Sequence, residues 1–265
     1  MHVYIYDSFL NHKKYGGTLA RVETRLTDLG LNGKISRLGV MKNIQNTVEN
    51  ELKRGAKTII AVGNDRTVNQ VISAIAGASQ ISSAGSGARR SVPLGIIPIG
   101  KDDNFIANSL GISPEEEACD ILSGRRIEKL DLARANDSFF LSGAFISSVG
   151  TVIEMGKTYS IEILDEGDIN VINMAAANQL KPANAKFNPQ DGILELFIRV
   201  KKKKGFLKLS GAEIGESIFS LKELTIHNNK NRPLILDGSV EIPTPARISV
   251  LKQKLSIIVG KERSF

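Results

Sequence analysis

The pattern of apolar and polar residues up to about residue 125 predicts strands alternating with helices. Apolar strands are expected at 2–7, 34–39, 58–63 and 93–100, and one-sided helices at 18–30, 43–56, after residue 63, and at 114–124. The strand at 58–63 is apolar throughout, as is typical where both faces of a parallel sheet are covered. This βαβ rhythm predicts a doubly wound parallel sheet.

The rhythm changes after about residue 128. Short stretches of alternating polarity predict antiparallel strands at 138–148, 160–164, 168–176, 192–201, 221–228 and 233–238. We therefore expect an α/β nucleotide-binding domain over residues 1–128, followed by a mainly antiparallel β-sandwich domain over residues 129–245. Two further strands in the tail 246–265 either close the second domain or return to the first.

Composition places the chain among globular proteins of a reducing compartment. With one cysteine in 265 residues it has no internal disulfide, and three scattered histidines make a histidine-based metal site a poor expectation. The first residues lack the basic flank and apolar core of a signal peptide, and no uncharged apolar run reaches the length of a membrane span. A cytoplasmic protein is expected.

The formal net charge of +7 suits an anionic partner, either nucleic acid, an anionic membrane surface or a phosphorylated substrate. A lysine-rich surface without such a partner is the plain alternative. No zinc, RNA-recognition or helix-turn-helix signature is present, and aromatic residues for base stacking are few. The expectation is therefore that nucleic acid is not the partner.

The loop from Gly63 to Thr67 joins a buried strand to a helix. In open parallel sheets ligands bind at the carboxyl ends of strands, and helix N-termini favour phosphate. Here Asp65 could hold Mg²⁺ or orient a hydroxyl, and Thr67 could donate to a phosphate oxygen. On the spacing alone, the favoured interpretation is that Asp65 or Thr67 caps the helix.

A second loop follows the next buried strand, from Gly100 to Asn104. Lys101 could meet phosphate, and Asp102 and Asp103 could hold a cation. The alternative is a solvated turn with an Asx cap.

These two loops carry a family resemblance. "AVGNDRTVNQVISAI" followed by "PLGIIPIGKDDNFIANSLGI" resembles the diacylglycerol kinase catalytic-domain family, which reads G-G-D-G-T-x-N-E and G-x-x-P-x-G-T-x-N-D-F at these places. The later segments "LDLARANDSFFLSGAFISSVG", "LKPANAKFNPQDGILELFIRV" and "KELTIHNNKNRPLILDGSVEIPTPARISV" are similar to the family's in the same order. The resemblance runs from about Lys57 over nearly the whole remaining chain.

The resemblance implies a fold, a reaction and a set of site residues. The fold is the two-domain one described above, and the reaction is transfer of the γ-phosphoryl group of ATP, with Mg²⁺, to a lipid hydroxyl. From the resemblance and the chemistry of the two loops we expect nucleotide binding by Gly63, Asn64, Arg66, Thr67, Asn69, Gly100, Lys101 and Asn104. For catalysis we expect Asp65, Asp237 and Glu241, and for a metal ion Asp65 and Asp191.

Several positions depart from the family pattern. Asn64 and Arg66 replace two glycines of the first motif, and the late Asp-Gly-Glu reads Asp237-Gly238-Ser239. Serine does not accept a proton at neutral pH as a carboxylate does. Glu241, two residues on along a strand, could take over that role only if the loop is shifted.

Two other functions therefore stay open beside a lipid kinase. One is a pseudokinase that binds nucleotide or lipid without turnover, and the other is a kinase for a soluble substrate such as NAD. The expected partner is a lipid at an anionic membrane surface, reached peripherally on the inner face. Lys201 to Lys204, with Phe206 and Leu207, could touch anionic headgroups, although a solvated hairpin turn is the slightly favoured interpretation. A homodimer is left open.

Overall fold

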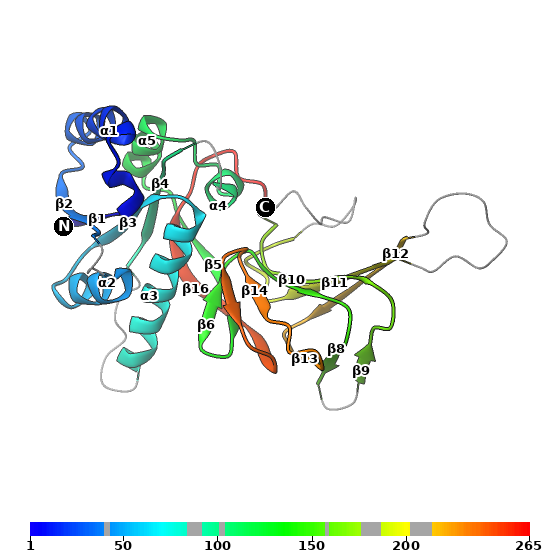
Figure 1. The fold of residues 1–265 in the computed structure, drawn as a ribbon. Coiled ribbons are helices and arrows are strands. Elements are labelled where there is room, and N and C mark those ends of the chain that lie inside the picture. Colours follow the sequence, from blue (N-terminus) through cyan, green and yellow to red (C-terminus); the bar gives the residue numbers. More distant parts are fainter. Residues whose placement is uncertain (40–42, 84–91, 101–103, 157–158, 176–186, 202–213) are drawn as a thin grey trace, which may run out of the picture. The chain divides into compact units, whose positions relative to one another are not determined.

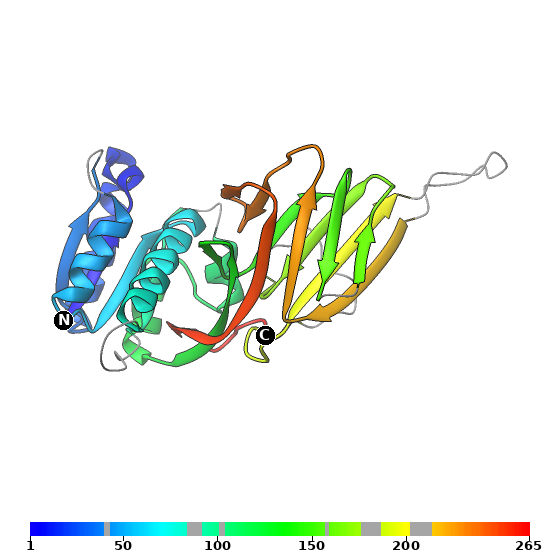
Figure 2. The same ribbon diagram turned by 90° about the horizontal axis from the view of Figure 1, so that it is seen from below.

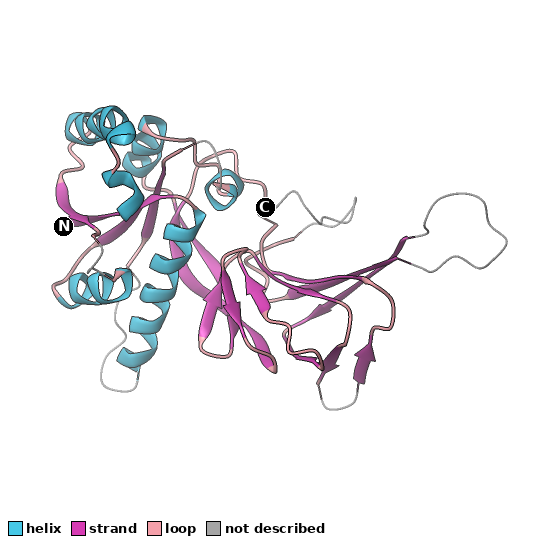
Figure 3. Cartoon of the chain, in the orientation of Figure 1, coloured by secondary structure: helices cyan, strands magenta, loops and turns pink. Residues whose placement is uncertain are grey.

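The computed structural model describes residues 1–39, 43–83, 92–100, 104–156, 159–175, 187–201 and 214–265. The chain divides into two compact units. Unit 1 comprises Met1–Leu130 with Gln253–Phe265, and unit 2 comprises Asp131–Lys252. The tail thus contributes to unit 1 from Gln253 onward. Helices are confined to unit 1, within the residues that the structure describes (Figure 3).

Unit 1 is built on parallel strands. The strands are β1 (His2–Tyr6), β2 (Gly33–Arg37), β3 (Thr58–Gly63) and β4 (Leu94–Pro98), in the order β2-β1-β3-β4. The long strand β16 (Ala246–Ile258) follows β4 and pairs with it in parallel, Ile257 opposite Leu94. Every residue of β3 and β4 is buried, whereas the edge strand β2 has no fully buried residue. The apolar run at 58–63 is therefore covered on both faces, as predicted.

Helices cover both faces of this sheet (Figure 1). They are α1 (Gly16–Asp28), α2 (Ile44–Lys53), α3 (Asp65–Ser83), α4 (Phe105–Ser109) and α5 (Glu116–Gly124), with short 3₁₀ turns at Ser8–Asn11 and Lys13–Tyr15. Helix α1 lies beside α5, and α2 beside α3 on the opposite face. The chain first steps outward from β1 to β2 and then crosses back to β3, and this reversal of direction accompanies the placement of the helices on different faces. The predicted doubly wound sheet is confirmed.

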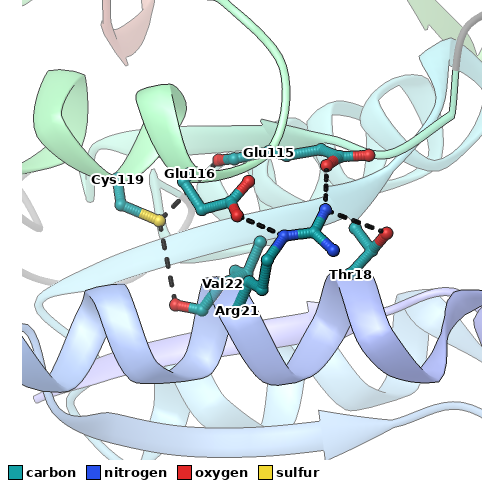
Figure 4. Close-up of polar contacts among 6 residues, drawn as sticks. All are labelled: Thr18, Arg21, Val22, Glu115, Glu116 and Cys119. Atoms are coloured by element: carbon teal, nitrogen blue, oxygen red, sulfur yellow. Dashed lines mark hydrogen bonds and ion pairs between the residues drawn. The ribbon is translucent and has the colours of Figure 1, made fainter.

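Most of the apolar side chains on the helix faces are buried. Leu19, Val22 and Leu26 of α1 are at most 5% exposed, and the apolar residues on one side of α3 are at most 6% exposed: Val68, Val71, Ile72 and Ile75. Arg21, on α1, joins this helix to α5 through Glu115 and Glu116, with 2.8 Å to Glu115 (Figure 4).

Unit 2 is a two-layer antiparallel structure (Figure 2). One layer contains β8 (Thr151–Met155), β9 (Tyr159–Glu162), β13 (Glu223–Asn228) and the first half of β16. The other is a six-stranded sheet in the order β12-β11-β10-β7-β14-β15. Its strands are β7 (Gly143–Ser147), β10 (Gly167–Ile172), β11 (Leu194–Lys201), β12 (Ile214–Leu221), β14 (Leu234–Leu236) and β15 (Val240–Ile242). Strands β5 (Ile127–Ala135) and β6 (Ser138–Phe140) form a hairpin beside β16.

Buried side chains from both layers form one apolar core, which includes Ile153, Ile226 and Ile248 from the first and Ile146, Val171 and Leu196 from the second. Alternate residues of each strand point into this core, which is the packing of a β-sandwich. The strand predictions differ at several places. The predicted strand 138–148 is split into β6 and β7, the two strands expected in the tail are the single strand β16, and β5, β8, β12 and β15 were not predicted. The backbone N–H groups between β6 and β7 are bound by Asp237 instead of a neighbouring strand.

Candidate functional site

The candidate site lies where the path of the chain through the parallel sheet reverses, between β1 and β3. Ligands of open α/β sheets bind at such a point, beyond the carboxyl ends of the strands. Asp7 follows β1 directly, and its backbone N–H donates to Val62 O at 3.1 Å. The Thr67 hydroxyl donates to Asp7 Oδ2 at 2.6 Å. The loops after the two strands are therefore fastened together.

Gly63 is needed at the end of β3 because Thr67 approaches its backbone closely. A Cβ atom at this position would lie 2.4 Å from Thr67 Oγ1 and 3.0 Å from Thr67 Cβ. Thr67 itself is fully buried. The Thr67 hydroxyl lies 2.6 Å from Asp7 Oδ2 and 3.3 Å from Asn64 Oδ1, so it has acceptors within the protein, and its donation to a phosphate stays a prediction.

The cap of α3 is Asn64. Its side-chain Oδ1 accepts from the backbone N–H of Thr67 at 3.3 Å, and its carbonyl accepts from Val68 N at 3.0 Å. The interpretation that Asp65 or Thr67 caps this helix was therefore wrong. An asparagine in place of the family's second glycine supplies the side-chain acceptor that glycine lacks.

Asp65 instead reaches the second loop. Its Oδ2 accepts from Phe105 N at 2.7 Å and its Oδ1 from Ile106 N at 3.1 Å, so the carboxylate caps α4. Asn104, which is 8% exposed, donates through Nδ2 to Gly100 O at 2.8 Å. The two predicted loops therefore meet, with Asp65 as the link. Lys101, Asp102 and Asp103 lie outside the described residues.

A cavity of about 340 Å³ opens beside the first loop. This volume is within the range of small-molecule sites. Its polar side includes the cap residue Asn64 and, from the first turns of α3, Arg66 and Gln70, where the backbone N–H groups favour an anion. The remaining lining residues come from the segments after β1 and β2 and from α2: Asp7, Ser8, Phe9, Leu38, Gly39 and Ile44.

Asn69 stands out on the same helix. It is 4% exposed, and neither amide atom has a hydrogen-bond partner among the residues that the structure describes. Buried amides are nearly always paired, so Asn69 retains a donor and an acceptor that can contact a bound group. Asn69 is one of the positions that match the family's first motif.

In unit 2, Asp237 is engaged in structure. Its carboxylate accepts from the backbone N–H groups of Leu141, Ser142 and Gly143 at 2.9, 2.8 and 2.9 Å, and from the Ser142 hydroxyl at 2.6 Å. Burial raises the pKa of Asp237, while these donors act against the rise. Asp237 therefore holds the start of β7, and its catalytic role stays a prediction.

Glu241 lies on β15, opposite Ile235 of β14, and its side chain is exposed. Ser239 sits in the turn between these strands, where its backbone N–H donates to Leu236 O at 3.0 Å. The hairpin thus holds Ser239 at the turn and Glu241 on the following strand.

The Asp191-Gly192 turn is bound by the buried Asp131 and lies near Glu195, two residues for which the sequence predicted no role. Asp191 Oδ1 accepts from Ile193 N at 2.9 Å, and the fully buried Asp131 accepts from Gly192 N at 2.6 Å. Burial, together with the charge of Asp191, raises the pKa of Glu195 to about 7. Nothing in the strand pattern distinguishes Glu195 from a solvated strand residue.

Within the described residues, no group of three or more His, Cys, Asp or Glu side chains is arranged to hold a metal ion.

Known proteins share this fold over its whole length. A solved structure titled a diacylglycerol kinase from Bacillus anthracis aligns with a TM-score of 0.75 and 19% identity, covering 99% of this chain and 97% of that one. A second solved structure, titled a candidate diacylglycerol kinase from the same organism, gives a TM-score of 0.76 at 17% identity, covering 99% of this chain and 98% of that one. At these identities the likeness shows the fold, an α/β unit joined to an antiparallel one.

The sequence comparisons identify the family. The model of the diacylglycerol kinase catalytic domain matches residues 3–135. A Staphylococcus carnosus protein named as a candidate lipid kinase is 22% identical over 288 residues, covering 91% of this chain and 90% of its own. A Cronobacter sakazakii protein, also named as a candidate lipid kinase and as YegS-like, is 29% identical over 100 residues, which is 38% of this chain and 31% of its own. The chain belongs to the diacylglycerol kinase catalytic-domain family and is a lipid kinase-like protein.

Proposed function

We propose that this protein transfers the γ-phosphoryl group of ATP to a hydroxyl of diacylglycerol or a related lipid, at the cytoplasmic face of a membrane. The observation that carries the proposal is the polar cavity at the start of α3, at the reversal point between β1 and β3. Family membership and the names of the relatives support the same reaction.

The residues at this cavity fit a nucleotide phosphate. Arg66 brings a cationic side chain to the lining, Asn64 and Gln70 bring amides, and the first N–H groups of α3 point the same way. The unpaired amide of Asn69 supplies a donor and an acceptor in the same helix. Bound ATP would supply the phosphoryl group, with Mg²⁺ offsetting its negative charge.

Two family residues act by positioning in this proposal. The Thr67 hydroxyl holds Asp7, and the Asp65 carboxylate holds the start of α4. Thr67 and Asp65 therefore fix the segments after β1 and β4 relative to the start of α3, where the phosphate is proposed to bind. In this role their contribution is to keep donors in place before the substrate binds.

A second candidate function is a pseudokinase that binds nucleotide or lipid without turnover. The replacement of the family's late glutamate by Ser239 favours this function. Ser239 lies in the turn of the hairpin, and the nearest acid that follows it, the exposed Glu241, lies on the next strand. The preceding Asp237 already accepts four hydrogen bonds from its neighbours. Both features leave the lipid hydroxyl without an evident proton acceptor from this hairpin.

The test is Mg²⁺-ATP turnover by the purified protein on mixed vesicles that contain diacylglycerol, together with thermal unfolding in the presence of ATP. Arg66→Ala is the site variant, and Lys57→Ala is the control, because Lys57 is an exposed cation that precedes β3 at the end opposite to Asn64. Loss of one charged contact to phosphate is expected to weaken ATP binding about tenfold in Arg66→Ala. Lys57→Ala should behave as the wild type.

The outcomes separate the candidates. The kinase proposal is supported if phosphorylated lipid forms and the ATP concentration needed for half-maximal turnover rises in Arg66→Ala but not in Lys57→Ala. An ATP-dependent rise in Tm that Arg66→Ala reduces, without product, supports the pseudokinase. Absence of both product and thermal shift would overturn a nucleotide site at this cavity.

A further inference from the structure

Asp7 lines the candidate nucleotide cavity, and the sequence predicted no role for it. All the residues that line this cavity belong to unit 1. Among them, within the described part of the chain, Asp7 is the one acid and Arg66 the one strong cation. A carboxylate beside a proposed phosphate site requires an explanation, because two negative charges at short distance repel each other.

The Asp7 carboxylate is held in place but keeps capacity for a further contact. Its Oδ1 accepts from the Ser8 hydroxyl at 3.1 Å and from Phe9 N at 3.2 Å, while its Oδ2 accepts from the Thr67 hydroxyl at 2.6 Å. A carboxylate offers about four acceptor positions, so roughly one is left, on Oδ2. Asp7 has no ion-pair partner among the residues that the structure describes. Its charge is therefore available to a cation.

This donor set fits the Mg²⁺ that accompanies ATP. Mg²⁺ takes oxygen ligands, keeps several of its waters, and is usually bound by one or two carboxylates together with the phosphates of a substrate. A cage of three acids is therefore not needed for it. Asp7 supplies a carboxylate at the cavity, and the first N–H groups of α3, beside Arg66, favour the phosphates.

The two acids that the sequence predicted as metal ligands are engaged elsewhere. Asp65 is not among the residues that line the cavity, and both of its carboxylate oxygens accept from the first N–H groups of α4. Asp191 belongs to unit 2, where its carboxylate accepts from Ile193 N at 2.9 Å. Of these three acids, only Asp7 lines the cavity.

We propose that Asp7 is the carboxylate that holds the Mg²⁺ of bound Mg²⁺-ATP. This inference rests on the proposed function, because it requires a nucleotide at this cavity. Thr67 then acts as a positioning residue, since its hydroxyl fixes Oδ2 of Asp7. ATP without a metal ion is repelled by Asp7, whereas Mg²⁺-ATP carries a cation that attracts it. The affinity for ATP therefore depends on Mg²⁺ through this one side chain.

The test is calorimetric titration of the full-length protein with ATP, once with Mg²⁺ and once with a chelator. For the wild type we expect a Kd about tenfold lower with Mg²⁺. Asp7→Asn keeps the size of the side chain and removes its charge. It should bind Mg²⁺-ATP about tenfold more weakly than the wild type, and metal-free ATP about threefold more tightly. A merely structural role of Asp7 would weaken binding in both conditions, so the opposite signs identify the contact with the metal ion.

Two control variants separate the charge of Asp7 from its hydrogen bond and from the other predicted metal ligand. Thr67→Val removes the donor to Asp7 but leaves the carboxylate, and Asp191→Asn removes the acid of unit 2. Both should keep the ratio of the two Kd values that the wild type has. If circular dichroism shows that Asp7→Asn is unfolded, Asp7→Ser takes its place with the same expected signs. A wild-type ratio in the Asp7 variant would overturn the proposal, and so would loss of the ratio in Asp191→Asn alone.

Failure of the metal contact and failure of the proposed function are distinguishable in the same titration. If the wild type binds ATP equally well with Mg²⁺ and with the chelator, the role of Asp7 is wrong and the nucleotide site stands. If the wild type binds ATP in neither condition, the nucleotide site itself is wrong, and the role of Asp7 is wrong with it.

Discussion

Thr67 Oγ1 donates a hydrogen bond of 2.6 Å to Asp7 Oδ2, which joins two residues 60 positions apart in the chain. Asp7 also accepts from Phe9 N at 3.2 Å through its other carboxylate oxygen. A single side chain therefore organises the segment after β1 and attaches it to the start of α3. The cavity at the reversal point takes its lining from both of these segments.

The Asp7–Thr67 hydrogen bond should contribute measurably to stability. Thr67→Val keeps the shape of the fully buried side chain but removes the donor, so the free energy of unfolding should fall by about 1–3 kcal/mol. Urea denaturation of Thr67→Val, Asp7→Ala and the double variant gives the coupling energy. We expect a coupling of about 1 kcal/mol, and additive single effects would contradict the bond.

Gly63 should not tolerate a side chain, because a Cβ atom would lie 2.4 Å from Thr67 Oγ1. Gly63→Ala is expected to lower the free energy of unfolding by about 1–3 kcal/mol, since the buried Thr67 must move away. Gly17→Ala is the control, as a Cβ there has no atom within 4 Å and Gly17 is helical. Alanine in a helix should leave stability unchanged or raise it by up to about 1 kcal/mol. Equal effects in the two variants would contradict the steric explanation.

Glu195 should make stability depend on pH. Burial raises the pKa of Glu195 from 4.5 to about 7 in the folded protein. Between these values the folded state holds a proton that the unfolded chain has released, so stability is fully present below pH 4.5 and falls as the pH rises to 7. After allowance for the solvent-exposed half of the group, the loss is ~1–2 kcal/mol.

This pH dependence is measured by urea denaturation at several pH values. A chelator is present so that a metal ion at the neighbouring Asp191 does not contribute to the result. Glu195→Gln carries no titrating group, so its stability should change less over the same range than that of the wild type. The same slope in both proteins would assign the pH dependence to other residues.

Cys119 should be unreactive in the folded protein. Burial raises the pKa of its thiol to about 11, and Asp120 adds to the rise. The residue has no exposed surface, and its Sγ lies 3.8 Å from Glu115 O and 4.0 Å from Val22 O, between α5 and α1 (Figure 4). Since the thiolate is the reactive form, a disulfide reagent at pH 8 should label the protein only after it unfolds.

Arg21→Ala tests whether the contact between α1 and α5 controls this protection. The Arg21 side chain is 55% exposed, so its ion pairs should contribute little. We therefore expect Cys119 to stay protected in this variant. Rapid labelling of the native wild-type thiol would contradict the burial of Cys119.

The sequence by itself predicted the elements whose residues are close together in the chain. The apolar face of α1, the fully apolar strand β3 and the change to alternating strands in unit 2 are repeating patterns over a few residues. Such patterns indicate which side of a helix or strand faces the core. Burial of that apolar side then stabilises the helix or strand whose period the pattern matches. The two loops after β3 and β4 were also located from the sequence, because glycine and polar residues end each buried strand.

Only the tertiary structure decided what the polar side chains in these loops do. Asp65 caps α4, whose first N–H groups are 40 and 41 residues further on, so Asn64 is left to cap α3. Asp237 is held by donors that precede it by 94 to 96 residues, and Glu195 has a raised pKa because its strand is covered. A hydrogen bond forms with whichever group folding brings within about 3 Å, and no local period encodes that partner. Periodicity along the chain therefore determines which residues are buried, whereas the packing of distant segments determines which polar groups meet.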